Sequence, residues 1–361
     1  MKPAELKVHL LCLGLKPEVE IDKGRKGGAG PAGGRYLLLP GNLCVNAAFW
    51  GKFVESSPFT LVEHRGKIII RRGNEEISEA KVVPYPEFYK MKTSDGVPMW
   101  KVALLHGTDC LATTVLQTCV YWRHGKACKF CGIELSYRAG RTILLKRPKQ
   151  FREVVDAAVR EGVCKHITLT IGTTGSPDRG ALILKEIVQE VKSHHDIPIH
   201  VQLEPPDDDK FLEELADAGA DTIGIHVETF DRKVFKEVCP GKARIDIDRY
   251  FEAWRTCIDL FGEYQVSTFV IAGIGENDES ILRGAEEVAR MGVIPYLVPL
   301  RPIIGTPFEN RAPPTPERMI KLYRVLAETL KSYGVDPRKN RAGCVRCGAC
   351  SAITEAYTGF L

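Results

Sequence analysis

The chain has 361 residues, 44% of them hydrophobic and 27% charged, and a formal net charge of +4. This composition is ordinary for a globular protein and excludes a disordered tail, a collagen-like repeat and a small disulfide scaffold. The small net charge argues against a nucleic-acid partner, and no apolar run approaches the ~18 residues of a membrane span. Because the start of the chain has acidic residues and no small-residue cleavage site, we expect a cytoplasmic protein.

Residues 1–108 are expected to form an accessory α+β region. Short β-like runs separated by Gly and Pro lie at 36–39, 67–70 and 81–83. The preceding segment, 23–35, holds six glycines without a periodic apolar pattern, which predicts a loop. Its glycines and basic residues would also suit an anion bound by backbone N–H groups. A plain surface loop is the simpler interpretation, because no strand–loop–helix phosphate motif surrounds it.

From residue 109 to about 310, apolar β-branched runs alternate with helical patterns. The predicted strands are 111–117, 166–171, 199–203, 222–227, 266–271 and 295–299. The predicted helices between them are 148–161, 182–192, 210–218, 246–260 and 279–291. This alternation predicts an α/β fold, in which helices cover a parallel sheet. Six strands fall short of an eight-stranded barrel, so we expect a partial (β/α)6 TIM-like barrel with its active site at the carboxyl ends of the strands.

The remaining segment, 311–361, is expected to hold one more helix, 316–333, followed by a Cys-rich region. The chain has twelve cysteines. In a reducing compartment, thiols serve metals or catalysis more often than disulfides. Six of the twelve fall in two tight groups, and the others are scattered. The two groups are therefore the candidate metal ligands.

The first group, Cys119, Cys128 and Cys131, directly follows the first predicted strand of the barrel. Three thiolates on one loop suit three corners of a [4Fe–4S] cluster and leave one iron open to a substrate. A zinc site formed by the same cysteines and His124 is the alternative.

These cysteines and the ends of the later strands resemble the radical S-adenosylmethionine (SAM) superfamily, over residues 109–310. Phe130 precedes the third cysteine as it does in that family, while the cysteine spacing is eight then two residues rather than three then two. The resemblance implies a [4Fe–4S] cluster that binds SAM, and an electron donor such as ferredoxin. It also implies cleavage of SAM to methionine and a 5′-deoxyadenosyl radical, which abstracts hydrogen from an unactivated C–H bond. The element that binds the methionine amino group would be Gly172, Thr173, Thr174 and Gly175, although it lacks the acidic residue of that motif.

The resemblance also assigns cofactor contacts to residues after the later strands. Glu204 and Glu228 are expected to make polar contacts with SAM, or else to pair with Lys or Arg at the barrel mouth. Gly273 and Gly275 would let the backbone approach the adenosine closely, or else form a strand-end turn. Arg301 would meet a carboxylate group, or else form a surface ion pair.

The second group, Cys344, Cys347 and Cys350, forms a C-x2-C-x2-C run near the end of the chain. This spacing suits a second, auxiliary [4Fe–4S] cluster, and a zinc knuckle is the alternative. No fourth cysteine follows at ferredoxin spacing, so the remaining ligand is remote, an oxygen, or not from the protein. The candidates within the chain are Cys44, Cys110 and Ser351.

The fourth strand end, His226-Val227-Glu228-Thr229 with Pro240-Gly241 after it, resembles lipoyl and biotin synthases, and among them the archaeal two-component lipoyl synthases. That resemblance implies sulfur insertion into an octanoyl chain on a lysine, with the auxiliary cluster as sulfur donor. The partners would be an octanoylated protein or peptide and a second radical SAM protein. The whole chain also resembles radical SAM proteins of nitrilase gene clusters, which implies a small-molecule substrate. A non-catalytic zinc protein with an interaction surface is the third alternative.

Overall fold

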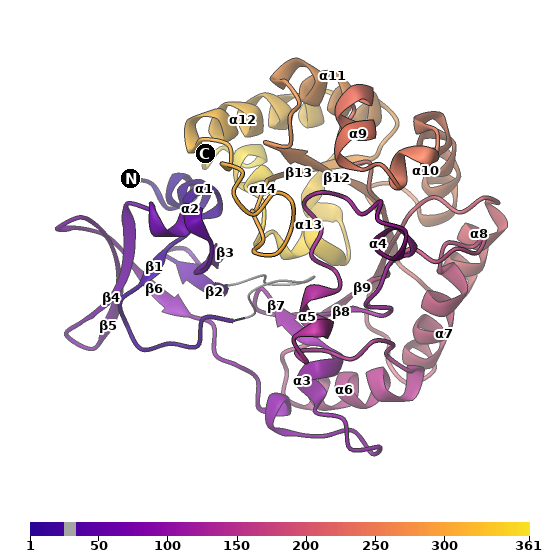
Figure 1. The fold of residues 1–361 in the computed structure, drawn as a ribbon, viewed down its shortest axis with the longest axis horizontal. Helices are drawn as coiled ribbons and strands as arrows, with labels where there is room; N and C mark the ends of the chain where they lie inside the picture. Colours follow the sequence, from indigo (N-terminus) through magenta and orange to yellow (C-terminus); the bar gives the residue numbers. More distant parts are fainter. Residues whose placement is uncertain (25–33) are drawn as a thin grey trace.

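The computed structural model describes residues 1–24 and 34–361. Most of the predicted glycine-rich loop, with its proposed anion cradle, is residues 25–33 and lies outside the described residues. The described chain forms two sheets, an N-terminal one and a larger one that curls into a partial barrel (Figure 1). The fold is therefore the predicted α/β class with a partial TIM-like barrel.

Among the described residues, the N-terminal sheet has six strands in the order β1-β4-β5-β6-β2-β3. Their bounds are β1 (Lys16–Pro17), β2 (Gly34–Leu39), β3 (Leu43–Ala48), β4 (Phe59–His64), β5 (Lys67–Arg72) and β6 (Glu75–Val82). The helices of this region are α1 (Pro3–Leu13) and α2 (Lys52–Glu55). Leu6 and Leu10 of α1 are buried in one cluster with Val45 of β3 and Phe59 of β4. This small apolar core fixes the sheet beneath α1.

Within the described ranges, the barrel sheet has seven strands in the order β13-β12-β11-β10-β9-β8-β7. Their bounds are β7 (Leu104–His106), β8 (Cys110–Thr114), β9 (His166–Thr170), β10 (Ile199–Leu203), β11 (Thr222–Ile225), β12 (Val266–Ala272) and β13 (Ile294–Pro299). The strands β8 to β13 are parallel and correspond to the six predicted ones, whereas β7 is antiparallel to β8. The extra strand is only three residues long, too short to produce a recognisable period.

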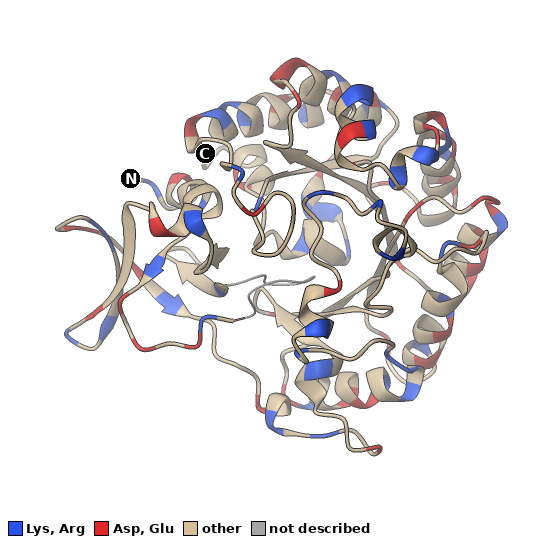
Figure 2. Ribbon diagram, in the orientation of Figure 1, with Lys and Arg blue, Asp and Glu red and all other residues tan. Residues whose placement is uncertain are grey.

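Helices cover the outer face of the barrel sheet (Figure 1). The six that the sequence predicts are α6 (Pro148–Arg160), α7 (Ala181–Lys192), α8 (Lys210–Asp217), α10 (Ile247–Phe261), α11 (Asp278–Arg290) and α12 (Pro316–Ser332). Charges of both signs mix on these helices in Figure 2, while β8 to β13 contain no Asp, Glu, Lys or Arg. Strands without charges are typical of a sheet covered on both faces.

Several short helices were not predicted from the sequence. They are α3 (Met99–Val102), α4 (Val120–Arg123), α5 (Leu135–Arg138), α9 (Arg232–Val238), α13 (Gly343–Cys347) and α14 (Ile353–Tyr357), with 3-10 turns at Glu87–Lys90, Lys242–Arg244 and Pro337–Lys339. Most span about one turn, which is below the length at which an apolar stripe can be read. Among them α9 carries a signal that was available, because Asp231 caps it by accepting from the N–H groups of Lys233 and Val234.

The C-terminal segment returns to the barrel and to the N-terminal helix. Gly343 donates its N–H to His166 Nδ1 at the start of β9 (3.1 Å). On the other side, the buried Lys7 of α1 donates to a carboxylate oxygen of Glu355 in α14 (2.6 Å). The predicted division of the chain at 108 and 310 stays a prediction. No helix in the described part of the chain is long and apolar enough to cross a membrane.

Candidate active site

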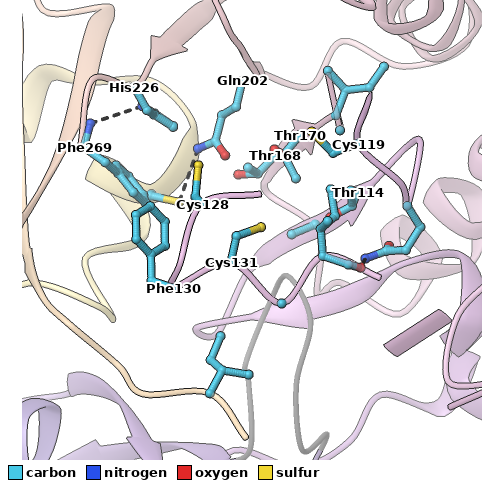
Figure 3. Close-up of a pocket in the computed structure, with 18 of the residues that line it drawn as sticks. Thr114, Cys119, Cys128, Phe130, Cys131, Thr168, Thr170, Gln202, His226 and Phe269 are labelled. Carbon is cyan, nitrogen blue, oxygen red and sulfur yellow. Dashed lines mark hydrogen bonds between the residues drawn. The ribbon is translucent and has the colours of Figure 1, made fainter. Parts of the chain in front are cut away.

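A cavity of about 460 Å³ lies inside the barrel, where the carboxyl ends of its strands meet the loops that follow them (Figure 3). Residues two positions apart on two central strands face it: Thr168 and Thr170 of β9, and Gln202 and Glu204 at β10. This follows from the two-residue period of a strand. The position matches the predicted active-site end of the barrel.

All three cysteines of the first group line this cavity. Their loop is anchored to two neighbouring strand ends: Val120 donates its N–H to the carbonyl of Thr173 (2.8 Å), and the Tyr121 hydroxyl donates to Glu204 (3.0 Å). A further N–H bond from Cys131 to the carbonyl of Cys128 (3.0 Å) closes the turn between them. The loop is therefore held in place by the barrel itself, and its thiols face one space.

The donor set fits an iron–sulfur cluster. Burial raises the pKa of the Cys131 thiol to about 12, and it also raises that of Cys119. A bound metal reverses this preference, because a coordinating thiol is deprotonated. Within the described residues, no group of three or more His, Cys, Asp or Glu side chains is arranged to hold a single metal ion. A cubane cluster binds each thiolate to a different iron and so needs a wider arrangement. His124 is exposed and does not line the cavity.

The segment after β9 packs tightly against this loop. Gly172 and Thr173 line the cavity, and a Cβ at Gly172 would lie 1.8 Å from the carbonyl oxygen of Thr118, so only glycine fits. Thr174 instead bonds to a neighbouring serine hydroxyl (2.7 Å), and neither it nor Gly175 lines the cavity. The structure thus brings two of the four predicted residues to the site.

Both predicted glutamates line the cavity and are buried. Burial raises the pKa of Glu204, while the positive charges of Lys242 and Arg179 oppose this shift. Glu228 forms an ion pair with Lys242 (2.7 Å), which also donates to the carbonyl of His226 (2.7 Å). The ion-pair alternative therefore describes Glu228, while Glu204 bonds only the Tyr and Thr hydroxyls of neighbouring loops.

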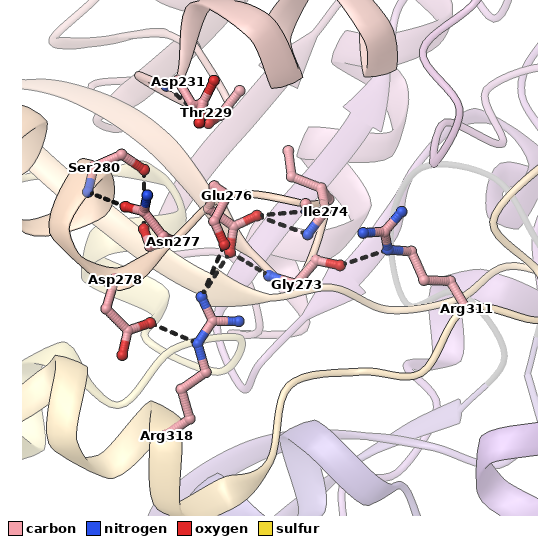
Figure 4. A network of polar contacts seen from close by, with 11 residues as sticks. Thr229, Asp231, Gly273, Ile274, Glu276, Asn277, Asp278, Ser280, Arg311 and Arg318 are labelled. Carbon is pink, nitrogen blue, oxygen red and sulfur yellow. Dashed lines mark hydrogen bonds and ion pairs between the residues drawn. The ribbon is translucent and has the colours of Figure 1, made fainter.

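The structure does not bring Gly273 and Gly275 to the cavity. Figure 4 shows the carboxylate of Glu276 folded back over this turn. It accepts the N–H groups of Gly273 (2.7 Å), Ile274 (2.8 Å) and Gly275 (3.0 Å), and it pairs with Arg318 (2.9 Å). The strand-end turn of the alternative interpretation is therefore present, at φ of +102° and +132° for the two glycines, and the adenosine contact stays a prediction.

Arg301 and Phe130 both line the cavity. Arg301 donates to the carbonyl of Asn46 in β3 and forms none of the ion pairs found among the described residues. Burial lowers the pKa of this guanidinium, while the Cys350 thiol and the Tyr36 hydroxyl act in the opposite direction. The expected surface ion pair is therefore wrong, because Arg301 points inward.

The second cysteine group borders the same cavity through Cys344 and Cys350. Two side-chain amides face these sulfurs: Gln202 Nε2 lies 3.6 Å from Cys344 Sγ, and Asn46 Nδ2 lies 3.5 Å from Cys350 Sγ. Cys347 is packed away from the cavity, beside Tyr36. The two cysteine groups, more than two hundred residues apart in sequence, thus share one space.

Of the three predicted fourth ligands, Ser351 is engaged elsewhere. Its hydroxyl donates to the carbonyl of Leu297 (2.6 Å) and accepts the N–H of Ile353 (3.3 Å). Ser351 is therefore corrected to a structural hydroxyl that fixes the segment to β13. Cys110 is fully buried with its sulfur beside Thr168 Oγ1 (3.3 Å), and Cys44 is half-buried on β3.

Sequence reasoning missed the two amides, Asn46 and Gln202. Gln202 could have been found, because it lies two residues before Glu204 and so faces the same side of β10. Asn46 had no signal, because its contact with Cys350 joins residues 304 positions apart.

Residues 125–288 match the model of the Radical SAM superfamily, a stretch that includes Cys128 and Cys131 and begins after Cys119. These residues therefore form a radical SAM domain, which implies a [4Fe–4S] cluster and SAM as cofactors. The chain is 23% identical over 351 residues to a bacteriochlorophyllide c C-7(1)-hydroxylase of Chlorobaculum limnaeum, which covers 91% of this chain and 84% of that protein.

Two solved structures are similar at lower identity. Methylornithine synthase has a TM-score of 0.49 and 17% identity over 63% of this chain and 64% of its own, so the chain spans just under two thirds of it. A radical SAM methyltransferase from Sphaerobacter thermophilus has a TM-score of 0.47 and 16% identity over 83% of this chain and 82% of its own. Both TM-scores lie below 0.5, so the fold assignment rests on the strand order itself.

Proposed function

We propose that this radical SAM enzyme inserts sulfur at an unactivated C–H bond of a substrate held between two iron–sulfur sites. Cys119, Cys128 and Cys131 would hold the first site, and Cys344, Cys347 and Cys350 the second. The observation that carries the proposal is that cysteines of both groups line one cavity. A second site used only to relay electrons would not need to border the space where the substrate lies.

A cluster held by Cys119, Cys128 and Cys131 would supply the electron that cleaves SAM, and one held by Cys344, Cys347 and Cys350 would supply a sulfide and accept one electron as the C–S bond forms. One C–H bond breaks and one C–S bond forms, and the hydrogen leaves in 5′-deoxyadenosine. Glu204 is the protein group best placed to accept hydrogen bonds from SAM, since it lines the cavity beside the first cysteine group. Tyr121 orients that carboxylate, and the apolar wall around it excludes water.

Charge and hydrogen bonding support an anionic group at the second cysteine site. Arg301 is a cation without a carboxylate partner among the described ion pairs, and Cys350 is among the acidic groups around it. Cys344 and Cys350 each have a side-chain amide N–H group nearby, from Gln202 and Asn46. Donors and a positive charge around thiolates stabilise their ionised form and tune the potential of a cluster.

The cavity wall suits an aliphatic substrate. Val102, Leu104, Ile133, Leu203 and Ile303 all contribute to it. We therefore take an octanoyl chain on a lysine of a protein or peptide as the first substrate to test, with a ferredoxin-type donor. A second radical SAM protein would perform the other of two insertions in lipoyl synthesis.

A second candidate is oxygenation or another change of a small molecule, as nitrilase-associated radical SAM proteins would perform. The observation that favours it is the 23% identity to a hydroxylase, which extends over almost the whole of both chains.

The deciding experiment is a single-turnover assay on the anaerobically reconstituted chain with SAM and an octanoyl-lysine peptide. The proposal predicts 5′-deoxyadenosine together with a peptide that gains the mass of one sulfur atom, and the isotope of sulfur used to build the clusters should appear in it. The matched control is the Cys344→Ala/Cys347→Ala/Cys350→Ala variant, which should release 5′-deoxyadenosine without the sulfur product. A peptide that gains oxygen, a methyl group or a double bond would contradict the proposal.

A further inference from the structure

The N-terminal sheet takes part in building the second cysteine site. In β3, Asn46 donates its backbone N–H to the carbonyl of Ala349 (2.8 Å) and its side-chain amide to Cys350 Sγ (3.5 Å). The carbonyl of Asn46 in turn accepts from Arg301 at the cavity wall. These hydrogen bonds attach β3 to the loop that carries Ala349 and Cys350.

The first helix holds the same loop from another side. Lys7 is 1% exposed, and its Nζ donates to the carbonyl of Gly348 (2.8 Å) as well as pairing with Glu355 (2.6 Å). A lysine is rarely buried so fully unless its charge is paired. The helix α1 and the strand β3 of the N-terminal region therefore both contact residues 348–350.

Cys44 lies on β3 two residues before Asn46, so its side chain projects from the same face of the strand, toward the cysteine loop. It packs with Cys347 and Ala349 around the buried ring of Tyr36. We propose that Cys44 is the fourth thiolate ligand of the second site. This rests on the proposed function in one respect, namely that the second cysteine group holds an iron–sulfur cluster.

The other free candidate, Cys110, also lies near Cys344 and Cys347, but it is held inside the barrel wall. It stands at the start of β8 within the barrel wall, fully buried, with its sulfur against Thr168 Oγ1 (3.3 Å). Cys44 keeps part of its surface exposed. Moving Cys110 into a ligand position would also disturb the pairing of β8 with β9.

A fourth thiolate has a chemical consequence. A cluster bound by four cysteines has no iron left open, so it offers its sulfides rather than a coordination site to the cavity. This suits a sulfur donor better than a substrate ligand. It also gives the accessory sheet a role, because metal binding would join the N-terminal and C-terminal parts of the chain.

The test uses the full chain carrying Cys119→Ala, Cys128→Ala and Cys131→Ala, so that only the second site is loaded. This parent should bind about four irons, and its Mössbauer spectrum should show four thiolate-ligated irons. Cys44→Ala should lose at least about half of the iron or show one iron with a distinct isomer shift, whereas the matched variant Cys110→Ala should keep the parent spectrum. Cys44→Ser keeps a smaller ligand and should give the distinct iron with less loss.

Circular dichroism of the metal-free variants controls for folding. A parent spectrum unchanged in both Cys44 variants would overturn the assignment, and a change confined to Cys110→Ala would transfer the role to that residue. A parent that binds no iron would instead contradict the second site itself and with it the proposed function.

Discussion

The two cysteine groups border one cavity but are built in opposite ways. The first sits on a single loop of thirteen residues, from Cys119 to Cys131, directly after a barrel strand. The second is short in sequence, yet its surroundings come from the beginning and the middle of the chain, through Lys7, Asn46 and Gln202. A site on one loop can be recognised from spacing, whereas a site assembled from distant segments shows its full composition only in the fold.

The difference also separates their expected roles. The first group lies against strand ends whose residues are expected to contact SAM, so its loss should stop all chemistry. The second lies where a substrate would meet the far wall of the cavity, so its loss should change the product and leave SAM cleavage intact.

The largest effect should follow removal of the first group. Cys128→Ala is expected to abolish formation of 5′-deoxyadenosine and to lower the iron content from about eight to about four per chain, since two cubane clusters hold about eight irons. Chromatography of the products and a metal assay measure both. Cys164→Ala, a buried cysteine of neither group, is the control. SAM cleavage that persists in Cys128→Ala would contradict the role of the first cysteine group in this reaction.

Disruption of the second cysteine group should leave SAM cleavage intact and stop sulfur insertion. Cys350→Ala is expected to keep SAM cleavage within about threefold of the unchanged chain while the sulfur product disappears, because only its own wall of the cavity changes. The ratio of 5′-deoxyadenosine to product, which should rise at least about tenfold, is the measurement. Equal loss of both would mean that the two groups do not divide the chemistry.

The ion pair between Lys242 and Glu228 should contribute to the free energy of unfolding. Lys242→Met leaves Glu228 buried without its partner, which is expected to cost about 3–5 kcal/mol of unfolding free energy. The double variant with Glu228→Gln should recover most of that loss, because residue 228 then carries no buried charge. Urea unfolding of the metal-free chain measures both. A loss below about 1 kcal/mol in the single variant would show that water reaches the pair.

Changing the turn after β12 tests whether Gly273 and Gly275 contact SAM. Glu276→Gln weakens three N–H bonds and an ion pair, so unfolding free energy should fall by about 2 kcal/mol. The KM for SAM should stay within about twofold, because Gly273 and Gly275 do not line the cavity. A large rise in KM without a change in stability would restore these glycines as adenosine contacts.

The smallest expected effect is a pH dependence from Glu204. Burial raises the pKa of its carboxyl above 4.5, so the folded chain holds this proton to higher pH than the unfolded chain does. Its contribution to stability is therefore present below pH 4.5 and is lost as the pH rises through the folded pKa. Glu204→Gln should flatten that decline in urea unfolding at a series of pH values. An unchanged slope would mean that the carboxyl is already ionised in the fold.

The barrel could be predicted from the sequence because its strands and helices repeat with clear periods. Runs such as 199–203 alternate with amphipathic helices such as α6, and the spacing of apolar residues alone separates the two. The cysteine groups were visible for the same reason, as local spacings. The role of Glu276 was not, because a carboxylate that folds back on three N–H groups leaves no periodic trace. Nor was the inward turn of Arg301, which depends on a contact with β3 some 255 residues away.

The central claim is that two iron–sulfur sites share one reaction cavity. The most direct test is the content of iron, sulfide and zinc in the anaerobically purified chain, in its first-group triple alanine variant and in its second-group triple alanine variant. The account predicts about eight irons in the unchanged chain and about four in each variant. Four irons that are unaffected by loss of the second group, or zinc in place of iron in either group, would contradict it.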